Sequence, residues 1–329
     1  MKQFTKYLLA TIILSTIGSV LLYVIVNPKN ENSIFNHTFT EQSSFITSKI
    51  LYEQLKINKY TLIFGTSRSA KITTEAFGSN VLNFSNSIYG NPNDVLYLLN
   101  SLDDKQWNNI DNIYYLVDNH TFNHRLHYDL NYKSSVIFEQ IKNFNMKNLL
   151  LSLKLLYFKI LDKKPQHGVN FDGSGYNYNE PKARKIDFDK IKYINELRFN
   201  TSEFKVLKSI KNKVVNKGLN IIFYTATMNT YYLKSIDKSD FLEHRKLLVE
   251  NCGEIIDLSY IDNISNKLYN FTDPTHLTSI KTKYILDNFL KNSNSQYIVN
   301  MNNYNIFYDD YFRRIDTINI NSSTFAHKT

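Results

Sequence analysis

Residues 61–69 read TLIFGTSRS, and this stretch decides the fold that the sequence predicts. It opens with a short, unbroken apolar run, which is typical of a parallel strand buried on both faces. Gly65 then permits a sharp turn, and Thr66 and Ser67 are small hydroxyl residues of the kind that begin a helix. The stretch therefore predicts a buried strand that turns at Gly65 into a helix, with the Ser67 hydroxyl at the carboxyl edge of a sheet.

Further apolar runs repeat this pattern along the chain. They are VLNFS (81–85), NIYYLVD (112–118), LNIIFYT (219–225) and EIIDLS (254–259). Helix-length segments accompany them, at about 44–57, 67–76, 92–106, 203–217, 231–251 and 277–291. Alternating strands and helices are typical of an α/β fold, in which helices cover a parallel sheet and ligands bind at the carboxyl ends of the strands.

The composition indicates a folded domain with a sizeable core. The chain has 329 residues, of which 43% are hydrophobic and 21% are charged. The net charge of +9 comes from scattered basic residues, so we read it as a solvated basic surface and expect no nucleic-acid partner. Cys252 is the single cysteine, which excludes an intrachain disulfide.

The amino terminus predicts a membrane anchor. Residues 7–26 are uncharged and apolar, and 20 helical residues span about 30 Å, the thickness of a hydrocarbon core. Lys2 and Lys6 precede the span, which favours a cytoplasmic tip at residues 1–6. We therefore expect a single-pass protein held in the lipid bilayer, with a stalk at 27–42 and its main domain in the periplasm or outside the cell.

Two segments do not fit the simple alternation. The connection between the third and fourth strands is about 100 residues long, and we expect an insertion at about 125–200 with a helical stretch near 134–163 and a loop at 168–181. This insertion either packs on the core or forms a lid or membrane-facing flap over the site. The tail at 293–329 shows weak strand character, and the sequence predicts no role for it.

A second stretch supplies a partner for Ser67. Asp273 and His276 lie three residues apart in the loop Asp-Pro-Thr-His, just before the last predicted helix. A serine hydroxyl is a poor nucleophile until a base takes its proton, and a carboxylate can orient that base. Taken alone, each stretch also has a purely structural interpretation. Ser67 can be an N-cap, and the Asp-Pro-Thr-His loop can be a turn with a capping Asp.

Together the two stretches resemble the SGNH (GDSL-like) esterase and lipase superfamily, over about residues 58–292. Gly65-Thr66-Ser67 matches its nucleophile block, and Asp273-Pro274-Thr275-His276 matches its Asp-x-x-His block. The resemblance implies a three-layer α/β/α, flavodoxin-like domain at 43–292 with Ser67, His276 and Asp273 as catalytic residues. It looks most like the membrane-anchored bacterial branch associated with O-acylation or deacylation of cell-envelope polymers.

The family's oxyanion blocks match less well. The resemblance implies backbone N–H donors at Ser67 and in the second block, where Ser85 stands in place of a glycine unless Gly90 takes that part. The third block implies an asparagine side chain, for which Asn119 is the candidate without the preceding glycine.

Further polar residues follow these blocks. Arg68 either contacts an anionic substrate group or pairs with a surface carboxylate, and His120 is a candidate pocket residue. His120, His124 and His127 have a spacing that also suits zinc, but we expect no metal and no cofactor.

The sequence thus predicts an extracytoplasmic serine esterase or O-acyltransferase acting on acyl esters of an envelope glycan. A transferase would need an acyl donor, which we expect from a multi-span membrane partner. The alternative is a catalytically inactive fold of the same kind, retained as a scaffold or glycan-binding subunit of an envelope assembly.

Overall fold

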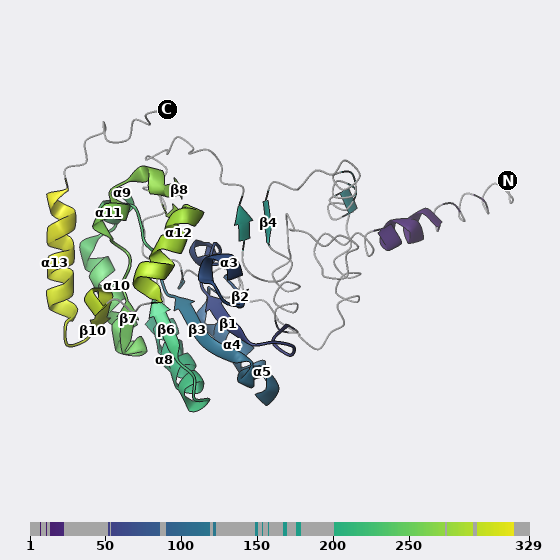
Figure 1. The fold of residues 1–329 in the computed structure, drawn as a ribbon, viewed down its shortest axis with the longest axis horizontal. Helices are drawn as coiled ribbons and strands as arrows, with labels where there is room; N and C mark the ends of the chain where they lie inside the picture. Colours follow the sequence, from purple (N-terminus) through teal and green to yellow (C-terminus); the bar gives the residue numbers. More distant parts are fainter. Residues whose placement is uncertain are drawn as a thin grey trace.

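The structure is a computed structural model, and its described part is a single α/β unit with short outlying pieces (Figure 1). It describes residues 7, 11, 14–22, 52, 54–85, 90–118, 121–122, 149–150, 153, 157, 167–169, 176–178, 201–273, 275–291 and 295–318.

A six-stranded sheet forms the centre of the described chain, in the order β10-β7-β6-β3-β1-β2. Neighbouring strands are parallel except for β10, which runs antiparallel to β7. Counted along the chain, the five parallel strands lie in the order 2-1-3-4-5, which is compatible with a flavodoxin-like fold. The strands are β1 (Tyr60–Phe64), β2 (Val81–Asn83), β3 (Ile110–Leu116), β6 (Ile221–Tyr224), β7 (Glu254–Ile256) and β10 (Ile298–Asn300).

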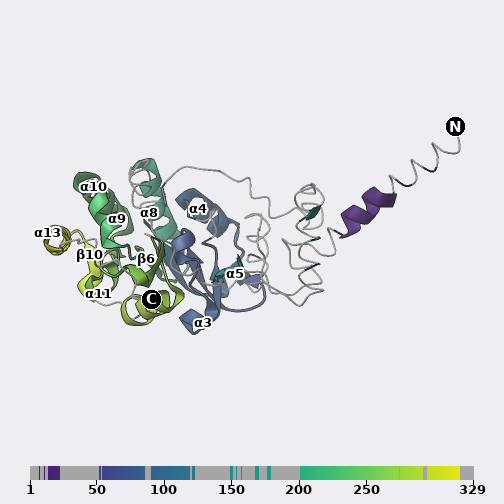
Figure 2. The same ribbon diagram turned by 90° about the horizontal axis from the view of Figure 1, so that it is seen from above.

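Helices cover both faces of this sheet. One face carries α4 (Pro92–Ser101), α8 (Thr201–Asn216) and α10 (Lys238–Cys252), and the other carries α3 (Thr74–Phe77) and α12 (Ser279–Ile285). Figure 2 shows α4, α8 and α10 on the side of the sheet opposite α3. Side chains of β1 alternate between the two cores, with Leu62 and Phe64 in the larger and Ile63 in the smaller. This is why the strand is apolar throughout.

Several predicted helices are broken where the sequence places an N-cap. The helix expected at 92–106 is two, because Asp103 and Gln106 form a capping box that begins α5 (Asp104–Asn108). The helix expected at 231–251 is likewise split into α9 (Thr230–Ser235) and α10, which Asp237 caps. The helix expected at 67–76 is wrong: only the 3₁₀ turn η1 (Ser67–Ser69) follows β1, and α3 begins after its N-cap Thr73.

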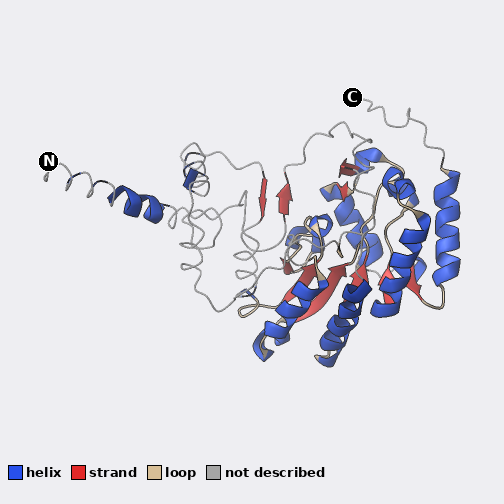
Figure 3. Cartoon of the chain, turned by 180° about the vertical axis from the view of Figure 1, so that it is seen from behind, coloured by secondary structure: helices blue, strands red, loops and turns tan. Residues whose placement is uncertain are grey.

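The carboxyl-terminal tail belongs to the domain rather than standing apart from it. It contributes β10 to the sheet edge and then α13 (Tyr304–Thr317), a helix where weak strand character was expected. Tyr308 of α13 donates its hydroxyl proton to Asp257, which also pairs with Arg245 at 3.0 Å, all three side chains being buried. Figure 3 shows α13 at the outer edge of the sheet.

The insertion and the amino terminus are described only in pieces. Residues 149, 150, 153 and 157 are helical, as expected for 134–163. Part of the expected loop is instead an antiparallel pair, β4 (His167–Val169) with β5 (Tyr176–Tyr178). Within the predicted anchor the structure describes residues 7, 11 and 14–22, which are helical, and no described helix is long and apolar enough to cross a bilayer.

Candidate active site

The turn after β1 requires a glycine. Gly65 has φ +141°, a conformation that side chains rarely adopt, and a Cβ there would lie 2.7 Å from Leu116 Cβ and 2.8 Å from Ser69 Oγ. The turn therefore packs directly against the end of β3. It leaves Ser67, the second residue after the glycine, exposed at the carboxyl edge of the sheet.

The structure brings Ser67 and His276 together across 209 residues of chain: Ser67 Oγ lies 2.8 Å from His276 Nε2. This is the separation at which an imidazole can take the proton of a hydroxyl as the hydroxyl attacks a carbonyl carbon. The other ring nitrogen, Nδ1, lies 3.2 Å from Thr275 Oγ1. The two side chains that the motifs predicted as nucleophile and base are thus in contact.

A short hairpin carries His276. Strand β8 (Phe271–Asp273) pairs with β9 (His276–Leu277), and Asp273 lies opposite His276 in the register. The Asp273 side chain lies outside the described part of the structure, so its predicted role as the carboxylate that orients His276 stays a prediction.

A second bond holds the hairpin against residues 65–69, the turn that carries Ser67 and is called the nucleophile turn below. Lys71, which follows η1 and is buried, donates from Nζ to the carbonyl oxygen of Leu277 at 2.6 Å. The two segments that supply Ser67 and His276 are therefore joined both by the contact between these side chains and by the bond from Lys71.

Asp118, at the end of β3, binds both neighbours of Ser67. Its Oδ2 accepts from Arg68 Nη1 at 2.7 Å and from Thr66 Oγ1 at 3.2 Å. The Asp118 side chain is fully buried and that of Arg68 is 5% exposed. Arg68 thus pairs with a carboxylate, as one of its two interpretations expected. This carboxylate is buried beside the site rather than on the surface.

The end of β2 holds the turn from the other side. Asn83 donates from Nδ2 to the carbonyl oxygens of Ser69 and Ile72, at 2.8 and 2.9 Å. Its Oδ1 accepts from the backbone N–H of Ser85 at 2.9 Å and from the Ser85 hydroxyl. Because this N–H is already bonded and Ser85 is buried, the structure counts against its predicted role as an oxyanion donor, which stays a prediction.

The structure describes some of the remaining oxyanion candidates and not others. Gly90 lies against the nucleophile turn: a Cβ there would be 3.4 Å from Thr66 Cγ2 and 3.5 Å from the Gly65 oxygen. The Gly90 carbonyl accepts from the Tyr115 hydroxyl at 3.2 Å. Asn119, His120, His124 and His127 lie outside the described residues. No backbone hydrogen bond joins the Ser67 N–H to a carbonyl of the described residues.

The helical segment that begins at Ser67 is too short to stabilise negative charge through its dipole. A helix was expected at 67–76, but η1 is three residues long. A single 3₁₀ turn carries little macrodipole, so any oxyanion stabilisation must come from individual N–H groups.

Sequence reasoning missed Lys71, Asn83 and Asp118 as residues that build the site. The available signal was a polar residue inside or directly after an apolar strand, as in Val-Leu-Asn (81–83) and Leu-Val-Asp (116–118). Such residues are buried and must find partners.

Comparisons with known proteins add no relative: no family model matches the sequence, and none of the curated proteins matches it. In the described part of the chain, no group of three or more histidine, cysteine, aspartate or glutamate side chains is arranged to hold a metal ion. The site is defined by its geometry, a serine–histidine pair at the carboxyl edge of a parallel sheet.

Proposed function

We propose that this chain is a serine acyl-transfer enzyme of SGNH type, an esterase or an O-acyltransferase. The observation that carries the proposal is the 2.8 Å contact between Ser67 Oγ and His276 Nε2. The two residues belong to the two motifs that resemble the family, and they meet at the sheet edge where doubly wound folds bind ligands. Neither motif would carry the proposal alone.

The reaction has two steps. Ser67 Oγ attacks the carbonyl carbon of an acyl ester as His276 takes the serine proton, and the tetrahedral adduct expels the alcohol, which receives that proton. The acyl-enzyme is then attacked by water, which gives hydrolysis, or by a sugar hydroxyl, which gives transfer. His276 serves as base for the second attack and returns a proton to Ser67. Asp273 would hold the imidazole in the required tautomer.

The oxyanion needs hydrogen-bond donors. The Ser67 N–H is one candidate, and with the Ser85 N–H bonded to Asn83, Gly90 is the remaining candidate from the second block, together with Asn119 from the third. Loss of one such donor typically costs about 3–4 kcal/mol in the barrier, so two adequate donors would be required for efficient turnover.

We further propose that the domain faces away from the cytoplasm on an amino-terminal anchor and acts on an acylated envelope glycan. The support is the apolar sequence at 7–26 and the resemblance to the membrane-anchored branch. A transferase of this kind would receive its acyl group from a multi-span membrane partner.

One observation favours the alternative, an inactive scaffold or glycan-binding subunit. The Ser85 N–H, which replaces the family's glycine donor, is occupied by Asn83, so the oxyanion hole is weaker than in the family pattern. The contact between Ser67 and His276 favours the enzyme, because an inactive fold has no need to keep the pair in hydrogen-bond range.

Hydrolysis of p-nitrophenyl acetate by the full chain in detergent tests the proposal. We expect the parent to be active and expect Ser67→Ala and His276→Ala each to lose activity at least about 10³-fold. Ser79→Ala, which changes an exposed serine 12 residues further along the chain, should keep the activity of the parent. Equal rates in all four proteins would contradict the enzyme and leave the scaffold.

A further inference from the structure

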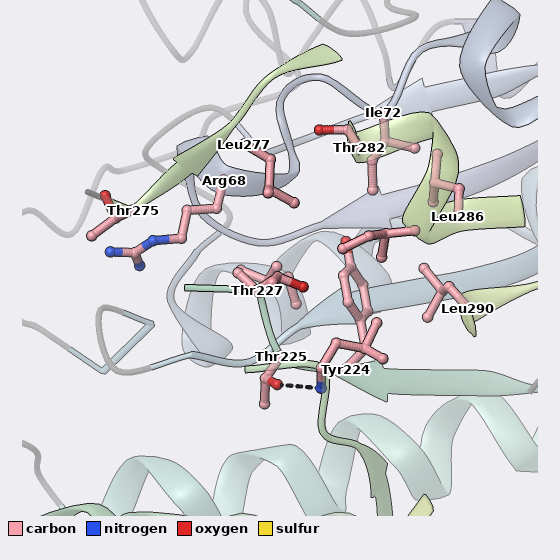
Figure 4. A pocket seen from close by; sticks show the side chains of 14 residues that line it. Arg68, Ile72, Tyr224, Thr225, Thr227, Thr275, Leu277, Thr282, Leu286 and Leu290 are labelled. Carbon is pink, nitrogen blue, oxygen red and sulfur yellow. Dashed lines mark hydrogen bonds between the residues drawn. The ribbon is translucent and has the colours of Figure 1, made fainter. Parts of the chain in front are cut away.

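A cavity of about 40 Å³ lies behind the serine–histidine pair. It sits between the carboxyl ends of β3, β6 and β7 and the helix pair α12 and η4 (Leu286–Leu290). Figure 4 shows Arg68, Thr275 and Leu277 at one end of the cavity and Leu286 and Leu290 at the other. Because Arg68 follows Ser67, and Thr275 and Leu277 flank His276, the first end lies beside the reacting side chains.

The walls of the cavity are mostly apolar. Its aliphatic lining residues are Ile72, Leu116, Ala226, Leu258, Leu277, Ile285, Leu286 and Leu290. Arg68 is the single charged residue among the described residues that line the cavity. Its charge is balanced by Asp118. A cationic group such as an ammonium would find no carboxylate in this lining, and a cavity of this kind favours an uncharged occupant.

Two features distinguish the cavity from a packing defect. The first is that η4 is a π-helix, a rare wide turn that occurs frequently at functional sites, and it supplies Leu286 and Leu290 to the far end. The second is the Thr227 hydroxyl, which is buried in the lining, with the residue 2% exposed, and has no hydrogen-bond partner among the residues that the structure describes. An unpartnered buried hydroxyl costs about 1–3 kcal/mol, so it marks a place where a ligand atom or a water would bind.

The tyrosine in the middle of the cavity is a neutral group. Burial raises the pKa of Tyr224 far above its ordinary value, so the hydroxyl keeps its proton. Its hydroxyl is buried in the cavity lining. The cavity therefore offers hydroxyl groups but no ionised side chain beyond the Arg68–Asp118 pair.

The size of the cavity limits the length of an occupant. A water needs about 10–15 Å³ of such volume, so 40 Å³ holds about three groups of that size. A chain of two or three carbon atoms beyond the ester carbonyl fills it, whereas an octanoyl chain is too long.

We propose that this cavity binds the acyl chain of the substrate and selects a short, uncharged acyl group, from acetyl to butyryl. The proposal rests on the proposed function for its connection to Ser67. The acyl carbonyl would lie at Ser67, and the chain would pass Arg68 and Leu277 toward Leu286, with Thr227 beside it.

The test compares acetate, butyrate and octanoate esters of p-nitrophenol as substrates of the full chain. The variant Ala226→Leu adds three carbon atoms to the wall, and Leu286→Ala removes three. Leu248→Ala is the matched control, because Leu248 is equally buried in the other core. We expect Ala226→Leu to lower kcat/KM for butyrate relative to acetate about 10-fold, and Leu286→Ala to raise octanoate relative to butyrate about 10-fold. Leu248→Ala should leave the ratios of kcat/KM between the esters unchanged. The same unchanged ratios in both Ala226→Leu and Leu286→Ala would overturn the proposal.

A second measurement separates the cavity from the catalysis. Binding of methyl butyrate to Ser67→Ala is measured by saturation-transfer NMR, with methyl octanoate and alanine methyl ester as comparison ligands. We expect saturable binding of the butyrate that Ala226→Leu abolishes in the Ser67→Ala background. If the parent hydrolyses no ester but this binding is seen, the proposed reaction fails and the cavity site stands. Absence of butyrate binding, or tighter binding of the cationic alanine ester, would overturn the cavity site.

Discussion

The buried carboxylate of Asp118 accepts a hydrogen bond from Arg68 at 2.7 Å, and in doing so fixes the residue that follows the nucleophile. The same oxygen accepts from Thr66, the residue that precedes it. Ser67 is therefore held between two residues that share one acceptor, although its own side chain is exposed and hydrogen-bonds to His276.

Removing this carboxylate should loosen the nucleophile turn. Asp118→Asn leaves the Arg68 charge buried without a counter-ion, and we expect a loss of about 3–5 kcal/mol in the free energy of unfolding, measured by urea denaturation. The double variant Arg68→Met with Asp118→Leu removes both charges and should recover most of that stability. Ester hydrolysis should stay low in the double variant, because neither Thr66 nor residue 68 is held. Full activity there would mean that the pair has no positioning role.

Lys71 provides a test of the histidine hairpin. We expect Lys71→Met to lower the rate of ester hydrolysis about 10-fold. The reason is that the Leu277 carbonyl loses its hydrogen-bond donor, so β9 is no longer held against the nucleophile turn. Lys234→Met is the matched control, because Lys234 makes the same kind of bond, at 2.7 Å to the Ile318 carbonyl, far along the chain from the site. An equal effect of both substitutions on the rate would count against a positioning role for Lys71.

The glycine of the nucleophile turn can be tested against another glycine of positive φ. Gly65→Ala should cost several kcal/mol of stability and abolish activity, because the new methyl group would collide with Leu116 and Ser69. Gly218→Ala has the control role: Gly218 has φ +74°, and a Cβ there meets nothing within 4 Å. It should cost only about 1 kcal/mol and leave the activity intact. Thermal unfolding and ester hydrolysis of the two variants, compared with the parent, decide the point.

The network that joins the tail to the sheet predicts a pH dependence of stability. Burial alone would raise the pKa of Asp257, but the Arg245 charge and the Ser259 and Tyr308 hydroxyls outweigh it and lower that pKa below its ordinary value. A carboxyl whose pKa is lower in the folded state adds stability above its unfolded pKa, about 3.9, and loses it as the pH falls through the folded pKa.

We therefore expect Asp257→Asn to destabilise the chain by about 3–5 kcal/mol at pH 7 and equally at pH 5. Below about pH 4 the difference from the parent should shrink, because the parent loses the same charge. Asp309→Asn, an exposed position on α13, should change little at any pH. A destabilisation by Asp257→Asn that fades between pH 7 and pH 5 would contradict the lowered pKa.

Much of the fold is visible in the sequence because its parallel strands are buried on both faces. Unbroken runs such as residues 61–64 then mark strands directly, and the pairing of Gly65-Thr66-Ser67 with Asp273–His276 predicted the contact between Ser67 and His276. The helix breaks at Asp103 and Asp237 were also readable as N-caps, but helical periodicity continued across them and hid them.

Other features depend on tertiary partners that no local pattern shows. Residues 305–312 (NIFYDDYF) have weak strand character in the sequence, but they are helical because Tyr308 and Tyr311 bury one face against the domain. The role of Ser85 could not be foreseen either, since it depends on the Asn83 side chain turning toward its N–H. Asn83 itself lay inside a predicted strand, where its bonds to Ser69 and Ile72 require the folded turn.

The most direct test of the central claim is covalent labelling of the full chain, in detergent, with a fluorophosphonate, which reacts with serine hydroxyls activated by a neighbouring base. We predict one added phosphonyl group, located by peptide mass spectrometry on Ser67. It should be absent in Ser67→Ala, at least about 100-fold slower in His276→Ala, and unchanged in Ser79→Ala. Failure of the parent to label under conditions that label a control serine esterase, or equal labelling of the parent and Ser67→Ala, would contradict the account.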